Sequence, residues 1–134
     1  MQIMTKENKE ILQKANALIA KKDYEGFLTY CTEDTLWVFV GEQILNGKDA
    51  VRQYMKENYL EPPRFHVDQI IADGDYVTAI GKISMKDQDG KVVDSDYCDV
   101  WRFREGKMAE LKAFVIPYEK QKADVTEHIT VNRP

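Results

Sequence analysis

The sequence has few of the residues that mark several common classes of protein. It contains only two cysteines, Cys31 and Cys98, in 134 residues. Two cysteines cannot build the disulfide framework of a small secreted domain. The first residues lack the apolar run of a signal peptide, and no later apolar run is long enough to cross a membrane. We therefore expect a cytoplasmic protein with reduced thiols.

Residues that hold metals, phosphates or nucleic acids are also scarce. The two histidines, His66 and His128, are far apart in the sequence and make no zinc pattern. There is no glycine-rich phosphate loop. The net charge is −4, with both signs spread along the chain and no basic cluster that could neutralise several phosphates. The sequence predicts no metal, no cofactor, no nucleic-acid partner and no membrane partner.

The N-terminal half has the spacing of amphipathic helices. Apolar residues recur with a helical period over residues 4–19. Asp23 is a typical N-cap for a short second helix over residues 24–30, which Glu33-Asp34 is expected to end. A third helix is predicted to open at residues 46–49 and to end before Pro62, because proline cannot continue a helix interior.

The remaining apolar segments are typical of strands. They are rich in β-branched and aromatic residues, and Asp-Gly or Glu-Gly pairs separate the later ones, which indicates hairpins. Gly81, in the middle of one run, predicts a bend or a bulge. The order of elements predicts an α+β fold, with helices on one face of a mostly antiparallel sheet. The predicted strands are residues 35–40, 65–72, 76–86, 91–104 and 107–118.

The strand at residues 91–104 carries the most informative pattern. Alternate side chains of a strand share a face, so Asp99 lies on the same face as three large aromatic residues, Tyr97, Trp101 and Phe103. Burying an unpaired carboxylate is costly, and such a group usually responds with a raised pKa. Asp99 is therefore the candidate functional acid. Cys98 and its alternate neighbours lie on the opposite face.

Four segments together resemble one family of folds. Residues 22–25 leading to residues 30–34, residues 46–51 and residues 99–108 resemble the nuclear transport factor 2-like superfamily. Within that superfamily, the chain is most similar to SnoaL-like and ketosteroid-isomerase-like proteins.

The resemblance implies a cone-shaped domain over residues 1–118. A strongly bent sheet would wrap around three N-terminal helices and enclose an apolar pocket. It also implies a homodimer formed through the outer sheet face, which bears Cys98, Val100 and Arg102. The tail, residues 119–134, is expected to pack on the domain or on a partner subunit.

The resemblance assigns two alternative roles to Asp99. Ketosteroid isomerases keep a protonated acid at this position to hydrogen-bond a developing oxyanion, whereas SnoaL-type cyclases use the acid there as a general base. Three other catalytic positions of these relatives align with Phe39, with Leu111 and near Ala15, none of which can carry the same chemistry.

Two interpretations of the candidate site remain open. In the first, Asp99 is the catalytic group of a cofactor-independent isomerase, cyclase or dehydratase that acts on a small apolar or aromatic molecule. In the second, the domain binds a ligand or forms a dimer without catalysis. The simplest interpretation of the aromatic residues is that they belong to the core, since aromatic stripes usually do, although in a cone fold part of the core is the pocket wall. The predicted substrate-binding residues are Trp37, Phe39, Tyr54, Tyr59, Tyr97, Trp101 and Phe103.

Overall fold

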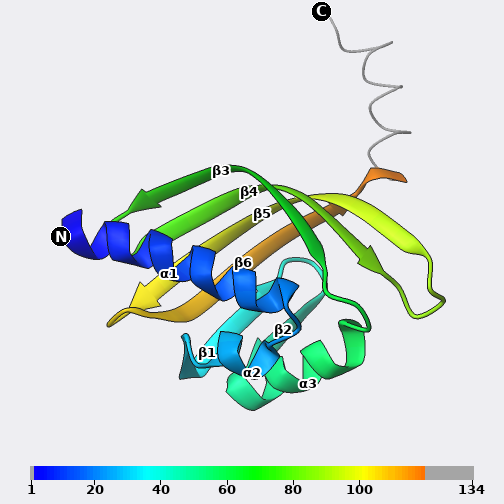
Figure 1. Ribbon diagram of the computed structural model, residues 1–134, viewed down its shortest axis with the longest axis horizontal. Coiled ribbons are helices and arrows are strands. Elements are labelled where there is room, and N and C mark those ends of the chain that lie inside the picture. The colour runs from blue at the N-terminus through cyan, green and yellow to red at the C-terminus, as the bar shows by residue number, and fades with distance from the viewer. Residues whose placement is uncertain (1, 120–134) are drawn as a thin grey trace, which may run out of the picture.

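Three helices precede or interrupt a six-stranded sheet in the computed structural model, which describes residues 2–119 (Figure 1). The helices are α1 (Gln2–Ala20), α2 (Tyr24–Leu28) and α3 (Lys48–Asn58). The strands are β1 (Cys31–Phe39), β2 (Gln43–Asn46), β3 (Arg64–Asp73), β4 (Tyr76–Lys86), β5 (Val92–Arg104) and β6 (Lys107–Pro117). The predicted tail lies outside the described residues from residue 120 onward, so its packing stays a prediction.

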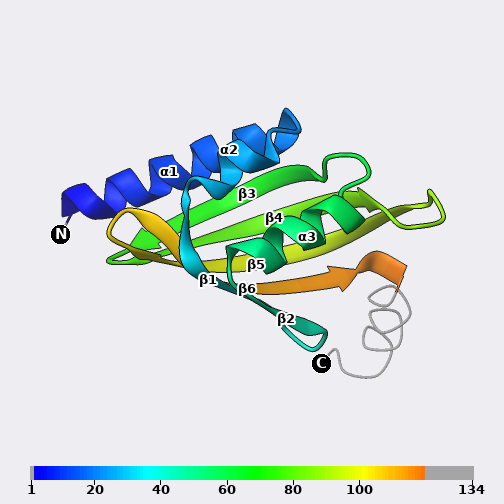
Figure 2. The same ribbon diagram turned by 90° about the horizontal axis from the view of Figure 1, so that it is seen from below.

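The strands form one mixed sheet in the order β2-β1-β6-β5-β4-β3. Strands β3 to β6 make the predicted antiparallel meander, and β1 joins it by pairing in parallel with β6. The sheet curves around the helices, which all lie on its concave side (Figures 1 and 2). The predicted α+β class with a bent sheet around three helices is confirmed.

The helices bury the stripes that their sequences predict. In α1, Leu12, Ala15 and Ile19 are buried, at the spacing that places side chains on one helix face. In α3, Val51 and Met55 are buried one turn apart. The predicted N-cap of α2 is also present, because the Asp23 carboxylate accepts a hydrogen bond from the Gly26 amide at 2.9 Å. The helices pack on the sheet through these buried apolar faces.

A bulge in β3 bends the sheet opposite Gly81. The register between β3 and β4 shifts between Val67 and Gln69, directly beside this glycine. A Cβ atom on Gly81 would lie 2.0 Å from the carbonyl oxygen of His66. Only glycine allows the two backbones to approach this closely, so the bend predicted from Gly81 is confirmed as a bulge.

One strand was not predicted from the sequence. β2 has four residues, mostly exposed, and it pairs with β1 at the edge of the sheet. It lies between Gly41 and Gly47, both with positive φ. A short polar segment between glycines is typical of a loop, because the pairing partner that makes it a strand cannot be seen in its own composition.

Candidate functional site

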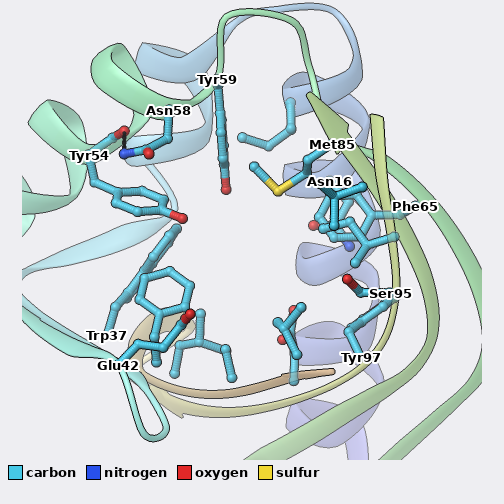
Figure 3. A pocket seen from close by; sticks show the side chains of 18 of the residues that line it. Asn16, Trp37, Glu42, Tyr54, Asn58, Tyr59, Phe65, Met85, Ser95 and Tyr97 are labelled. Atoms are coloured by element: carbon cyan, nitrogen blue, oxygen red, sulfur yellow. Dashed lines mark hydrogen bonds between the residues drawn. The ribbon is translucent and has the colours of Figure 1, made fainter. Parts of the chain in front are cut away.

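A cavity of about 320 Å³ lies between the concave side of the sheet and the helices. Its lining includes Asp99 and six of the seven predicted substrate-binding residues, namely Trp37, Phe39, Tyr54, Tyr59, Tyr97 and Trp101. Segments that are distant in the sequence therefore meet at one place (Figure 3). Ligand sites in proteins commonly have this size and this largely aromatic lining.

Phe103 is the predicted residue that does not line the cavity. It is buried in the core, at the end of β5 that lies beyond Trp101. The register of β5 with β6 also shifts between Arg102 and Phe103. Strand alternation correctly placed Phe103 on the inner side, but alternation says nothing about how far along the strand the cavity extends. We therefore leave Phe103 out of the proposed site.

The neighbours of Asp99 on the sheet leave space above its carboxyl group. Asp99 pairs with Ala79 of β4 on one side and with Ala113 of β6 on the other, and both alanines are buried. Alanine is small, and Ala113 lines the cavity beside Asp99. This pattern positions the acid on the cavity wall instead of closing it within packed side chains.

The Asp99 carboxylate makes no hydrogen bond and no ion pair with any of residues 2–119 in this structure. Burial removes water from its carboxylate, and this loss of solvation raises the pKa of Asp99 from 3.8 to about 7. An acid with such a pKa has both protonation states available near neutral pH. It can therefore donate a proton or accept one, as general acid–base chemistry requires.

The aromatic residues form a connected wall. The Trp37 ring meets the Trp101 ring edge-on with centroids 5.8 Å apart, and it meets the Phe39 ring at 6.1 Å. Phe39 lies 5.0 Å from Tyr54, whose ring is 5.9 Å from that of Tyr59. Such contacts fix the rings relative to one another. The wall offers a rigid apolar surface to a flat molecule.

Two tyrosines bring hydroxyl groups into this apolar space. Tyr54 and Tyr59 extend from the C-terminal part of α3 toward the centre of the cavity (Figure 3). Burial raises the pKa of both hydroxyl groups, so each remains a neutral hydrogen-bond donor. Neither hydroxyl is hydrogen-bonded to another described residue. They are donors available to a ligand.

Sequence reasoning missed several polar residues of the lining. Two of the missed residues are Asn16 and Ser95. They lie on the same side of the cavity as the predicted Tyr97, and Trp37 lies on the other side (Figure 3). Ser95 has the same strand parity as Asp99, so the alternation of β5 could have found it. Asn16 follows Ala15 on α1, and its place depends on how that helix sits on the sheet. Glu42 lies in the β1–β2 connection, which was not predicted.

Polar contacts hold one edge of the cavity together. Lys86, near the β4–β5 hairpin, forms an ion pair with Glu61 at 3.0 Å. The side-chain amide of Gln88, in the same hairpin, donates to the backbone oxygen of Glu57 at 3.0 Å. Both contacts join the hairpin to the end of α3 or to the residues just after it. Lys86 and Gln88 themselves line the cavity.

Neither a metal site nor a membrane span is found in the described part of the chain. Among residues 2–119, no group of three or more His, Cys, Asp or Glu side chains could hold a metal ion. No helix in this range has the length and apolar character needed to cross a bilayer.

A family model describing the SnoaL-like domain matches residues 12–111 of the sequence. This match covers most of the chain and includes all of the cavity lining except Ala113 and Val115 on β6. The chain belongs to the SnoaL-like domain family. The predicted resemblance is thereby confirmed, and Asp99 lies within the matched region.

Solved structures show the same fold at low sequence identity. An NTF2-like protein of unknown function from Burkholderia pseudomallei is 17% identical, with a TM-score of 0.74 over 87% of this SnoaL-like chain and 95% of that one. SalBIII, an epoxide hydrolase/cyclase-like enzyme of pyran-ring formation in the polyether salinomycin, is 22% identical, with a TM-score of 0.75 over 82% of this chain and 91% of that one.

TerC, which was co-crystallised with polyporic acid, is 19% identical, with a TM-score of 0.71 over 87% of this chain and 96% of that one. None of the curated proteins compared with the chain is similar to it in sequence.

Proposed function

We propose that this SnoaL-like protein is a cofactor-independent enzyme in which Asp99 transfers a proton to or from a small, flat, largely apolar substrate. The observation that supports this proposal most strongly is the Asp99 carboxyl group, which has no hydrogen-bond partner among the described residues, has a pKa of about 7 and lies on the wall of an aromatic cavity. A carbonyl compound or a phenol fits this chemistry, because an enol or enolate forms when a proton moves. Isomerisation, cyclisation and dehydration are reaction types that can begin with such a transfer and need no cofactor.

The cavity volume limits the size of the substrate. An engineered cavity of about 150 Å³ with an apolar lining binds one benzene molecule. The present cavity, at about 320 Å³, is roughly twice as large. A molecule with two fused or linked rings is therefore the expected size. The stacked aromatic wall also favours a flat ligand over a globular one.

Two structural neighbours support a small-molecule role by analogy of fold. SalBIII is named as an epoxide hydrolase/cyclase-like enzyme, and TerC was crystallised with the small molecule polyporic acid. At these identities the similarity supports the fold alone, and a fold can carry many functions. The assignment to Asp99 therefore rests on the cavity of this chain.

Proton abstraction can be tested before the natural substrate is known. The probe is 2-tetralone, a two-ring ketone with acidic hydrogens next to its carbonyl group, incubated with the protein in D₂O. Exchange of those hydrogens for deuterium is followed by NMR. We expect the wild type to accelerate exchange, and Asp99→Asn to lower the acceleration by about 100-fold or more, the usual contribution of a general acid or base.

Ser95→Ala is the matched control, because it also changes a cavity-lining residue of β5 but leaves Asp99 in place. If the wild type and Asp99→Asn exchange deuterium into 2-tetralone at the same rate, Asp99 has no catalytic role.

The second candidate function is a non-catalytic binding or dimerisation module. It is favoured by Phe39 and Leu111, which are apolar residues of the cavity lining at positions where the related enzymes carry polar groups. If no two-ring ketone or phenol raises the thermal unfolding midpoint of the wild type, this second function is preferred.

A homodimer through the convex face of the sheet is part of either proposal. On β6, Phe114 and Ile116 alternate with cavity residues, point away from them and are exposed. Ile71 on β3 and Ile44 on β2 are exposed as well, on strands of the same sheet. Exposed apolar residues that spread across one face of a sheet in this way support a protein interface there. Phe114→Glu is expected to convert a dimer into a monomer, as measured by light scattering after size-exclusion chromatography. A monomeric wild type would refute the dimer.

A further inference from the structure

We infer that Tyr59 is a second catalytic residue, a hydrogen-bond donor that holds the carbonyl oxygen of the substrate while Asp99 moves the proton. This inference rests on the proposed function and adds the feature that the substrate must carry, which is a carbonyl group with an acidic C–H bond on the neighbouring carbon. Sequence reasoning left Tyr24, Tyr54, Tyr59 and Tyr97 as equal candidates for such a donor.

The end of α3 explains why the Tyr59 side chain reaches the cavity. Tyr59 is the C-cap of α3, and its backbone amide still donates to the Met55 carbonyl at 2.9 Å. Its φ and ψ of −94° and 64° are no longer helical, so the side chain leaves the helix surface. It then extends into the centre of the cavity (Figure 3).

Two neighbouring rings fix the direction of the Tyr59 ring. Tyr24 meets it edge-on at 5.6 Å and Tyr54 meets it edge-on at 5.9 Å. The ring is thus held on two sides, and only its hydroxyl end is free to meet a ligand. A donor fixed in advance stabilises a developing oxyanion without the cost of reorganising at the moment of reaction.

The Tyr59 hydroxyl also has the right electrostatic character. It makes no hydrogen bond with any of residues 2–119, although burial removes water from around it. Desolvation is the main reason that its pKa is raised, and the nearby Tyr54, Asp99 and Tyr24 add to the effect. Tyr59 therefore stays protonated at neutral pH, and the Asp99 charge is one of the influences that favour its protonated form.

The other three tyrosines fit the role less well. The hydroxyl groups of Tyr24 and Tyr97 are fully enclosed and have no partner among the described residues, and Tyr24 does not line the cavity. The Tyr54 hydroxyl reaches the cavity, but the pKa effects on it include the charge of Glu42 and not that of Asp99. Tyr59 alone among the four combines an open hydroxyl with electrostatic coupling to Asp99.

The resulting step balances without a cofactor. A C–H bond next to the carbonyl group breaks, and its proton moves to a carboxylate oxygen of Asp99. The electron pair of that bond forms a carbon–carbon double bond, while the carbonyl π pair moves to the oxygen that accepts the Tyr59 hydrogen bond. In a substrate with a further C=C bond conjugated with this enolate, the proton of Asp99 returns to the far carbon of that bond, which moves the double bond and restores the carbonyl group. The product is an isomer with the same composition and oxidation state.

A pair of probes isolates the oxygen contact. 2-Naphthol is a flat, fully aromatic mimic of the enol of 2-tetralone, with two hydrogen atoms fewer, and 2-methylnaphthalene has nearly the same shape without the oxygen. Affinities of both are measured by their own fluorescence for the wild type, Tyr59→Phe and Tyr24→Phe. Tyr24→Phe is the matched control, because it removes a hydroxyl group from a ring that touches Tyr59 but lies outside the cavity lining.

Tyr59→Phe is expected to weaken 2-naphthol binding by about tenfold, the size of one lost hydrogen bond, and to leave 2-methylnaphthalene binding within about twofold. Tyr24→Phe is expected to change neither affinity. Equal loss for both probes, or loss for neither, would overturn the role of Tyr59. If Tyr59→Phe does not fold, ¹³Cζ-tyrosine NMR of the wild type decides: 2-naphthol must shift the Tyr59 signal more than 2-methylnaphthalene does, and equal shifts overturn the inference.

Failure of this inference can be told apart from failure of the proposed function. One combined result would refute only the role of Tyr59 as a donor. In that result, Asp99→Asn loses deuterium exchange, but Tyr59→Phe leaves the ratio of the 2-naphthol and 2-methylnaphthalene affinities unchanged. Unchanged exchange in Asp99→Asn would refute the proposed function itself, whatever the Tyr59 variant does.

Discussion

Replacing Asp99 by Asn is expected to make the protein more stable at neutral and alkaline pH. The amide has nearly the same shape as the carboxyl group and carries no charge at any pH. The wild-type acid must ionise inside the protein when the pH exceeds its raised pKa, and this ionisation without partners is unfavourable. The substitution removes that cost, so the gain in stability should depend on pH.

The sign and the window follow from the two pKa values. Between pH 3.8 and about 7, the unfolded chain has lost the Asp99 proton while the folded protein keeps it. The folded state binds more protons, so the free energy of unfolding falls as pH rises, by about 1.4 kcal/mol per pH unit. Below this window both states are protonated, and above it both are ionised. The loss is therefore complete above about pH 7.

The full size of the effect is at most about 4 kcal/mol, since the pKa rises by roughly three units and each unit corresponds to about 1.4 kcal/mol. Water that enters the cavity reduces the value, because the Asp99 carboxyl borders that space. Even half of this amount is a large part of the usual stability of a domain, about 5–15 kcal/mol.

Urea unfolding of both proteins at several pH values between 4 and 9 measures the effect. The difference in unfolding free energy, Asp99→Asn minus wild type, should rise up to about pH 7 and then stay level. All other titrating groups are common to both proteins and largely cancel in the difference. Ser95→Ala is a neutral control on the same strand face and should give a difference that does not change with pH. A flat profile for Asp99→Asn would refute the raised pKa.

Three further predictions concern parts of the fold that support the site. Gly81→Ala should destabilise the protein by several kcal/mol, about 3 or more, because the new methyl group would overlap the carbonyl oxygen of His66 2.0 Å away; urea unfolding measures this. Asp23→Ala should cost about 1 kcal/mol in the same assay, because the Gly26 amide loses its capping partner. Tyr24→Phe should stabilise the protein by about 1 kcal/mol, seen as a higher urea midpoint, because it removes an enclosed hydroxyl group that no described residue satisfies. The opposite sign in any of the three would contradict the packing around that residue.

Local patterns were enough to predict most of the fold. The Glu105-Gly106 pair closes the β5–β6 hairpin with both residues at positive φ, as a two-residue turn between twisted strands requires. Strand alternation placed Asp99 and Trp101 on the concave face, and the structure places both in the cavity lining. These features depend only on neighbours within a few residues, so the sequence shows them directly.

Features that depend on distant segments could not be predicted in the same way. β2 becomes a strand only through its pairing with β1, and Phe103 is packed in the core and does not line the cavity. Tyr59 was a candidate among several tyrosines, since its direction depends on the non-helical backbone at the end of α3. Each of these outcomes is set by packing between elements and not by local composition.

The protonation state of Asp99 tests the central claim most directly. Protein labelled with ¹³C at the aspartate side-chain carboxyl carbons can be titrated by NMR, and the signal lost in Asp99→Asn identifies the residue. The account predicts a midpoint near pH 7 in the free protein, and a displaced midpoint once 2-naphthol occupies the cavity. A midpoint near pH 4 that no cavity ligand moves would contradict it, because Asp99 would then be an ordinary solvated acid.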